Sequence, residues 1–200
     1  GVTDVDGRGI AGIENYFDQS LRHNGKPLRL AIDLRVQSIL RDELAHSMSE
    51  FKSLGAAGLV MDVQTGELIA MVSLPDFDPN RPLNMTDDAL FNRATKGVYE
   101  MGSTFKLFTA AMALDSGTVS MSDGYDASKP IRVASFTIRD FHAKNRWLSV
   151  PEIILHSSNI GAAKMAIDLG GAVQRSYLGK FGMLKPAQLE IPEVGVPLMP

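Results

Sequence analysis

The chain has 200 residues, 44% of them hydrophobic, and a formal net charge of -3. This length allows one ordinary hydrophobic core with a small appendage, and the charge gives no reason to expect nucleic acid or an anionic membrane surface as a partner. No cysteine is present, which excludes disulfides and thiol catalysis, and no run approaches the roughly 18 apolar residues of a membrane-spanning helix.

The first 27 residues are polar and punctuated by glycine, and they predict a turn leading into a short helix over residues 13–21. Residues 7–12 formally match the dinucleotide-binding pattern G-x-G-x-x-G. No strand precedes them, so we expect no such site. Turn-forming residues that end at Pro27 mark a boundary between a first segment, 1–27, and a main domain, 28–200.

The main domain begins with residues that predict strands and a long helix. Residues 28–33 alternate like a strand, and Asp33 is placed to cap a helix over residues 34–52. Two apolar runs, 57–63 and 67–73, flank a short turn sequence and predict a β-hairpin. The apolar stripe expected along the helix consists of Val36, Leu40, Leu44, Met48 and Phe51.

A serine three residues before a lysine, Ser103 and Lys106, opens an almost wholly apolar segment that runs to Leu114. Its composition predicts a helix that is hydrophobic nearly all round and therefore buried. Residues i and i+3 of a helix share a face, with Cβ atoms roughly 5–6 Å apart. The two side chains should therefore meet at the start of this helix.

This pairing suits nucleophilic catalysis. A serine hydroxyl is a weak nucleophile until a neighbouring base takes its proton, and a lysine is such a base only when neutral. Burial and the positive end of the helix dipole should both lower the pKa of Lys106. Ser103 is therefore the candidate nucleophile and Lys106 its base. The alternative is a chance match in which Lys106 only extends its ammonium to solvent.

A second Ser-x-x-Lys, Ser49 with Lys52, is an internal control. At about 100° per residue, Ser49 falls opposite the apolar stripe of the predicted helix and faces solvent. It has neither a buried lysine nor a helix N-terminus beside it. We interpret it as surface.

The remaining residues predict short strands and three helices. The strands are expected at 131–133 and 136–138, and Ser149 with Glu152 resembles a capping box for a helix that ends near Leu155. Two later helices are expected at 160–169 and 173–181, followed by a proline-rich coil.

Ser157 and Asn159 stand two residues apart between two predicted helices. In a turn or extended segment such residues point the same way, so both side chains are placed to enter a common cleft. The alternative is that Ser157 or Ser158 caps the following helix and that Asn159 is a turn residue.

Three ordered stretches, 62–80, 92–106 and 157–161, resemble the transpeptidase domain of class B penicillin-binding proteins, especially the cell-division (FtsI-like) D,D-transpeptidases. Met101 stands where that family usually has proline. The resemblance covers essentially the whole chain and implies an α+β fold, the penicillin-binding protein and serine β-lactamase-like transpeptidase fold. Residues 1–27 would end the pedestal or linker region, and 28–200 would form the N-terminal portion of the transpeptidase domain.

The resemblance implies acyl transfer through a serine ester. Ser103 would attack the penultimate D-Ala carbonyl of a peptidoglycan stem peptide, and a neighbouring stem amine would then take the acyl group. Lys106 would be the base, Ser157 would relay a proton, and Asn159 would hydrogen-bond Lys106 and the substrate amide. β-Lactams would acylate the same serine. No metal or organic cofactor is implied, and the histidines show no metal-type spacing.

The same resemblance implies the partners and the location. The partners would be the lipid-linked precursor and nascent glycan that carry stem peptides, β-lactam antibiotics and the division proteins of the parent, with no nucleic acid. Family members act in septal wall synthesis from the inner membrane, held by one N-terminal anchor that these residues do not contain. Their catalytic domain is periplasmic.

One family motif, Lys-Thr-Gly, does not occur in these 200 residues. In the family it binds the substrate carboxylate and precedes one of two backbone donors to the oxyanion, the other being the nucleophile's N–H. Loss of one such donor lowers the rate roughly 10²–10³-fold. We therefore expect a truncated fold with only the first two sheet strands, inactive or impaired, whose exposed strand edge favours self-association.

Two alternatives remain. A class D-like β-lactamase or a β-lactam sensor domain also uses Ser-x-x-Lys, although the division-type flanking motifs argue against both. A non-catalytic fragment or scaffold would keep the motifs without the activity.

Overall fold

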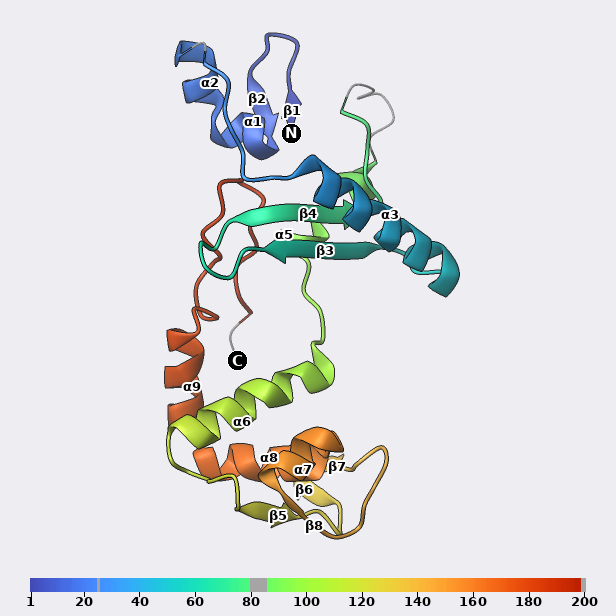
Figure 1. The fold of residues 1–200 in the computed structure, drawn as a ribbon, viewed down its shortest axis with the longest axis vertical. Coiled ribbons are helices and arrows are strands. Elements are labelled where there is room, and N and C mark those ends of the chain that lie inside the picture. The colour runs from blue at the N-terminus through green and yellow to red at the C-terminus, as the bar shows by residue number, and fades with distance from the viewer. Residues whose placement is uncertain (25, 80–85, 199–200) are drawn as a thin grey trace. The chain divides into compact units, whose positions relative to one another are not determined.

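The computed structural model describes residues 1–24, 26–79 and 86–198. They fall into two compact units, the first made of Gly1–Val98 with Pro186–Pro200 and the second of Tyr99–Lys185 (Figure 1). Within the described residues, no helix combines the length and the apolar character needed to span a bilayer.

The first unit starts with a small β-ribbon and two short helices. Their bounds are β1 (Val2–Thr3), β2 (Gly9–Ala11), α1 (Gly12–Tyr16) and α2 (Asp18–Asn24). The single helix predicted for residues 13–21 is wrong, because Phe17 leaves helical geometry with φ -102° and ψ 12°. The break lets the carboxylate of Asp18 accept from Gly9 N at 2.7 Å, which ties α2 to the ribbon.

The expected strand at residues 28–33 is also wrong, since these residues have no strand geometry. Asp33 N donates to Ile69 O at 2.9 Å, but this bond is not continued as a ladder. The predicted cap is confirmed: the Asp33 side chain accepts from Arg35 N at 2.8 Å and begins α3 (Leu34–Phe51). The helix ends at Lys52, which is in left-handed geometry.

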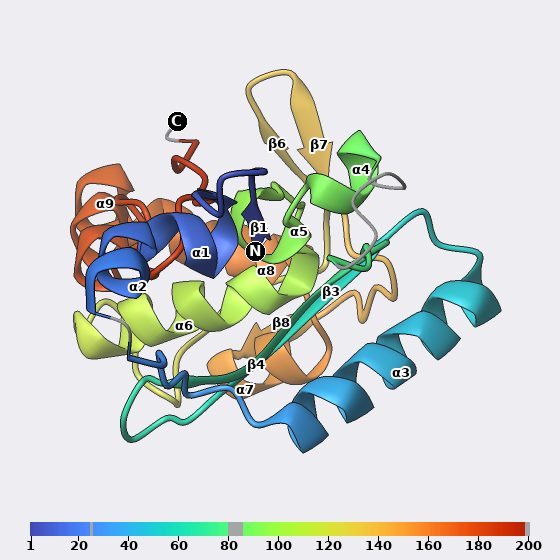
Figure 2. The ribbon, with the colours of Figure 1, turned by 90° about the horizontal axis from the view of Figure 1, so that it is seen from above.

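The predicted hairpin is confirmed by the antiparallel strands β3 (Ala56–Met61) and β4 (Leu68–Leu74). The helix α3 packs along this pair (Figure 2). Gln37 on α3 exchanges two bonds with the backbone of Met71, at 2.7 and 2.8 Å, and so satisfies part of the edge of β4.

The apolar stripe of α3 is only partly as expected. Leu40 and Leu44 lie against Gly58 on β3, where an added Cβ would be 3.1 to 3.2 Å from their methyl groups. Phe51, the last member of the predicted stripe, is 72% exposed. The hairpin contacts α3, but the last turn of the helix leaves Phe51 in solvent.

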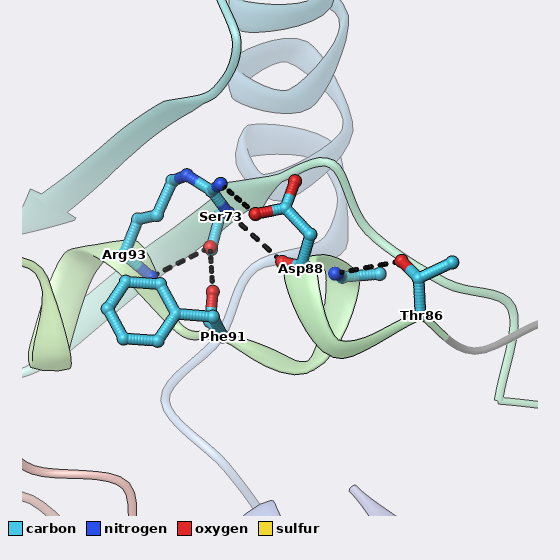
Figure 3. A network of polar contacts seen from close by, with 6 residues as sticks. Ser73, Thr86, Asp88, Phe91 and Arg93 are labelled. Atoms are coloured by element: carbon cyan, nitrogen blue, oxygen red, sulfur yellow. Dashed lines mark hydrogen bonds and ion pairs between the residues drawn. The ribbon is translucent and has the colours of Figure 1, made fainter.

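A polar network ties the chain after β4 back to that strand (Figure 3). Two one-turn helices, α4 (Asp87–Leu90) and α5 (Arg93–Lys96), come after β4 in the chain. The Ser73 hydroxyl accepts from Arg93 N at 2.9 Å and donates to Phe91 O at 3.2 Å, and the Arg93 guanidinium binds the Asp88 carboxylate. These side-chain bonds attach the start of α5 and the end of α4 to β4.

The second unit is mainly helical, with two short β-pairs. Its bounds are the 3₁₀ turn η2 (Gly102–Thr104), α6 (Phe105–Asp115), β5 (Gly124–Asp126), β6 (Ile131–Val133), β7 (Phe136–Ile138), β8 (Trp147–Ser149), α7 (Val150–Leu155), α8 (Asn159–Leu169) and α9 (Gly171–Lys180). The two predicted strands pair as β6 and β7, while the pair β5 and β8 was not expected.

The helix α6 is buried on one face only. Ala110, Met112 and Ala113 are buried, but Leu107 is 58% exposed and Phe105 41% exposed. The expectation of a helix buried all round is therefore wrong. Apolar residues on all sides of a helix allow any side to be buried. The packing of α7 and α8 against one side of α6 decides which of its residues are buried.

The junction of α7 and α8 depends on a small residue. The predicted capping box of Ser149 and Glu152 is present at the start of α7. At the start of α8, a Cβ added to Gly161 would lie 2.5 Å from Cγ1 of Ile153, whose side chain is fully buried. The two helices therefore approach closely because position 161 has no side chain.

We expect Gly161→Ala to destabilise the protein by about 1–3 kcal/mol, because overpacking outweighs the better helix propensity of alanine. Urea denaturation measures this change. Gly171→Ala is the matched control, since it also lies at the start of a helix and its added Cβ would meet nothing within 4 Å. Equal midpoints for the two variants would contradict the prediction.

Candidate active site

Three polar side chains of the second unit meet at the start of α6. Lys106 Nζ lies 3.0 Å from Ser103 Oγ, as the i, i+3 spacing predicts. It also donates to Ser157 Oγ at 2.9 Å and to Ser157 O at 2.8 Å, and Ser157 Oγ donates to Ser103 Oγ at 3.0 Å. The three groups form a closed triangle in which each hydroxyl contacts both the other hydroxyl and the amine.

Ser103 owes its place to the turn that precedes α6. It lies in η2, and Gly102 before it has φ +57°, a conformation that favours glycine. The Ser103 side chain is exposed, so a solute can reach its hydroxyl, whereas Lys106 in the next turn is partly buried.

Ser157 is presented by an unusual backbone conformation. It has φ +52°, and its N–H bonds to Ile154 O at 3.1 Å where α7 ends. The neighbouring Ser158 caps α8 by accepting from Gly161 N at 2.9 Å. The capping alternative is thus correct for Ser158, and it leaves Ser157 free to face Lys106.

The partial burial of Lys106 lowers its pKa below the ordinary value of 10.5, because desolvation disfavours the ammonium. The negative charge of Asp140 acts in the opposite direction and raises this pKa, but burial dominates. The predicted direction is confirmed, with burial as its first cause.

Asn159 does not join the triangle. It is the first residue of α8, and its side-chain nitrogen donates to Arg139 O at 2.8 Å. The hydrogen bond expected with Lys106 is not among the contacts of the described residues. Ser157 is left-handed and Asn159 is helical, so the extended geometry that would aim both side chains together does not apply.

Asp140 is the residue near the site that the sequence patterns did not single out. Its Oδ2 accepts from Ser158 Oγ at 2.8 Å, and its Oδ1 accepts from Ile160 N at 2.9 Å. The partners lie 18 and 20 residues away in sequence, so no local spacing marks the contact.

The second Ser-x-x-Lys can also be compared with the structure. Ser49 is exposed on α3, as the control predicts. Within residues 1–24, 26–79 and 86–198, no group of three or more His, Cys, Asp or Glu side chains is arranged to hold a metal ion.

Comparison with known proteins gives consistent results. The family model described as "Penicillin binding protein transpeptidase domain" matches residues 56–196. Over 204 aligned residues, the chain is 44% identical to "Probable peptidoglycan D,D-transpeptidase FtsI" of Caulobacter vibrioides, covering 100% of this chain and 35% of that protein. It is 28% identical to "Peptidoglycan D,D-transpeptidase FtsI" of Escherichia coli K12, covering 94% and 36%.

Solved structures show the same similarity. The transpeptidase domain of Burkholderia pseudomallei penicillin-binding protein 3 is 26% identical, with a TM-score of 0.71 over 85% of this chain and 48% of that one. Penicillin-binding protein 3 of Mycobacterium tuberculosis, 24% identical, has a TM-score of 0.86 over 100% and 48% and shows the shared fold. The chain spans about a third of the length of the curated relatives it matches.

Proposed function

Since this chain belongs to the penicillin-binding protein transpeptidase domain family and has the α+β fold of that family, we propose that the protein is a serine acyltransferase, a peptidoglycan D,D-transpeptidase. The observation that carries this proposal is the triangle of Ser103, Lys106 and Ser157. Residues 28–200 are assigned to the transpeptidase domain and residues 1–27 to the end of the preceding pedestal or linker region.

The first half of the proposed reaction makes a serine ester. Neutral Lys106 takes the Ser103 hydroxyl proton while Ser103 Oγ bonds to the penultimate D-Ala carbonyl carbon of a stem peptide. The Ser103 N–H is one donor to the resulting oxyanion. As the amide C–N bond breaks, the leaving D-Ala nitrogen receives the proton from Lys106 through Ser157, which contacts both Lys106 and Ser103.

The second half reverses these proton transfers. The side-chain amine of a neighbouring stem bonds to the ester carbonyl and gives up a proton through Ser157 to Lys106. The ester C–O bond then breaks, and Lys106 returns the proton to Ser103 Oγ. The products are a cross-link and the free enzyme, so protons balance without a further reactant.

The proposal also includes properties that membership of the family implies. β-Lactams acylate Ser103 because their ring amide offers the same carbonyl. The protein acts in septal wall synthesis with its division partners, anchored in the inner membrane with the catalytic domain in the periplasm. Asn159 contributes by binding the substrate amide. The 200 residues by themselves acylate slowly or not at all, because they contain no Lys-Thr-Gly sequence.

Benzylpenicillin labelling tests the proposal. Trypsin releases residues 97–106, which carry Ser103, and residues 42–52, which carry the control Ser49. In a form of the protein that includes a Lys-Thr-Gly strand, we expect a slowly hydrolysed penicilloyl adduct on the first peptide and none on the second. Labelling of both peptides, or of neither in a folded form that includes a Lys-Thr-Gly strand, would overturn the proposal. Rapid loss of the adduct with turnover would instead indicate a β-lactamase.

A further inference from the structure

Both carboxylate oxygens of Asp140 are used at the junction between α7 and α8. Oδ2 accepts from the Ser158 hydroxyl at 2.8 Å, and Oδ1 accepts from Ile160 N at 2.9 Å. Ile160 N is one of the first N–H groups of α8, which have no partner within the helix. Asp140 and Ser158 thus share the start of α8, with Ser158 Oγ accepting from Gly161 N.

The position of Ser157 depends on this junction. Ser158 is only 1% exposed, so its hydroxyl has no access to water if its acceptor is removed. Ser157, one residue earlier, has φ +52°, which is unfavourable for a residue with a side chain. Backbone bonds to α7 hold this turn on one side, and Asp140 holds it on the other.

We propose that Asp140 is a positioning residue of the acyl-transfer site, which fixes the Ser157 turn so that both Ser157 oxygens face Lys106. The inference rests on the proposed function and adds a residue to it. Asp140 touches none of the three triangle atoms directly, and it acts through Ser158 and the first turn of α8.

The charge of Asp140 also affects Lys106, and this effect can be tested separately from positioning. Its carboxylate raises the pKa of Lys106 against the larger effect of burial. The other charged side chains on helices packed against α6 are Glu152 on α7, Lys164 and Asp168 on α8, and Arg175 and Lys180 on α9. Among the charged groups of the described residues, Asp140 is the one whose charge shifts the pKa of Lys106.

Two variants separate position from charge when the rate of benzylpenicillin acylation is measured against pH in a form of the protein that includes a Lys-Thr-Gly strand. Asp140→Asn keeps the shape and an oxygen acceptor but removes the charge, so the midpoint of the profile should move to lower pH. Ser158→Ala keeps the charge but removes the bond to Asp140. Its plateau rate should fall roughly 10- to 100-fold with the midpoint unchanged, since small displacements of reacting groups slow catalysis by such factors.

Asp123→Asn is the matched control. Asp123 also accepts from a serine hydroxyl and a backbone N–H, both of Ser120, but its charge is not a cause of the shifted pKa of Lys106. The plateau rate and the pH midpoint of acylation in this variant should match those of the unsubstituted protein. The inference would be overturned if Asp140→Asn, Ser158→Ala and Asp123→Asn all shifted the urea midpoint of unfolding but left the pH profile of acylation unchanged. Asp140 would then have a purely structural role.

If Asp140→Asn does not fold, the Ser158→Ala variant tests the inference by itself. A plateau rate of acylation in Ser158→Ala equal to that of the unsubstituted protein would contradict the positioning role. Absence of labelling in the parent protein would refute the proposed function rather than this inference. Labelling of the parent with identical profiles in both variants would refute the inference and leave the function standing.

Discussion

In a form of the protein that includes a Lys-Thr-Gly strand, replacement of Ser103 by alanine is expected to abolish covalent labelling by benzylpenicillin. The variant removes the hydroxyl that becomes the ester oxygen, so no residual rate remains at this position. Intact-mass spectrometry measures the adduct, and Ser49→Ala, which changes the exposed serine of the second Ser-x-x-Lys, should label like the parent.

The geometry allows one specific contradiction of this result. Ser157 Oγ lies as close to Lys106 Nζ as Ser103 Oγ does, at 2.9 and 3.0 Å. Ser103 is the expected nucleophile because it is the serine of the Ser-x-x-Lys pair; it lies in η2, two residues before α6 begins. An adduct that survives in Ser103→Ala and disappears in Ser157→Ala would reverse the two roles.

Replacement of Lys106 by methionine should lower the acylation rate by about 10²–10⁴-fold, the range expected when a positioned base is removed. In the parent, the rate should rise with pH as Lys106 loses its proton, with a midpoint below 10.5 because burial lowers this pKa. The methionine variant should lose that dependence. A fluorescent penicillin followed by stopped flow gives both the rate and its pH profile.

Two further variants sharpen this test. Lys106→Arg keeps the positive charge but cannot become neutral in this pH range, so it should be as slow as the methionine variant. Lys52→Met, in the surface Ser-x-x-Lys, should leave the rate unchanged. A fast Lys106→Arg variant would show that the positive charge, rather than proton transfer, is what acylation requires.

Local patterns in the sequence were sufficient for several elements of the two units. The Asp33 cap, the β3–β4 hairpin, the capping box of α7 and the contact between Ser103 and Lys106 each depend on residues close together along the chain. The errors at residues 13–21 and 28–33 are of another kind. The helical pattern at 13–21 and the alternating pattern at 28–33 indicate only a local preference for helix or strand. Contacts with neighbouring groups decide whether the helix is interrupted and whether the strand finds a partner.

The rest of the site was decided by tertiary structure. Ser157 reaches Ser103 across 54 residues, and Asp140 reaches Ser158 across 18. Spacing along the chain cannot encode such contacts, because they depend on how closely α7, α8 and α6 pack. The same packing leaves Leu107 exposed and turns Asn159 toward Arg139 O. The sequence by itself thus predicted the contact between Ser103 and Lys106, whereas the fold decided which distant groups surround them, since only packing brings those groups within hydrogen-bonding distance.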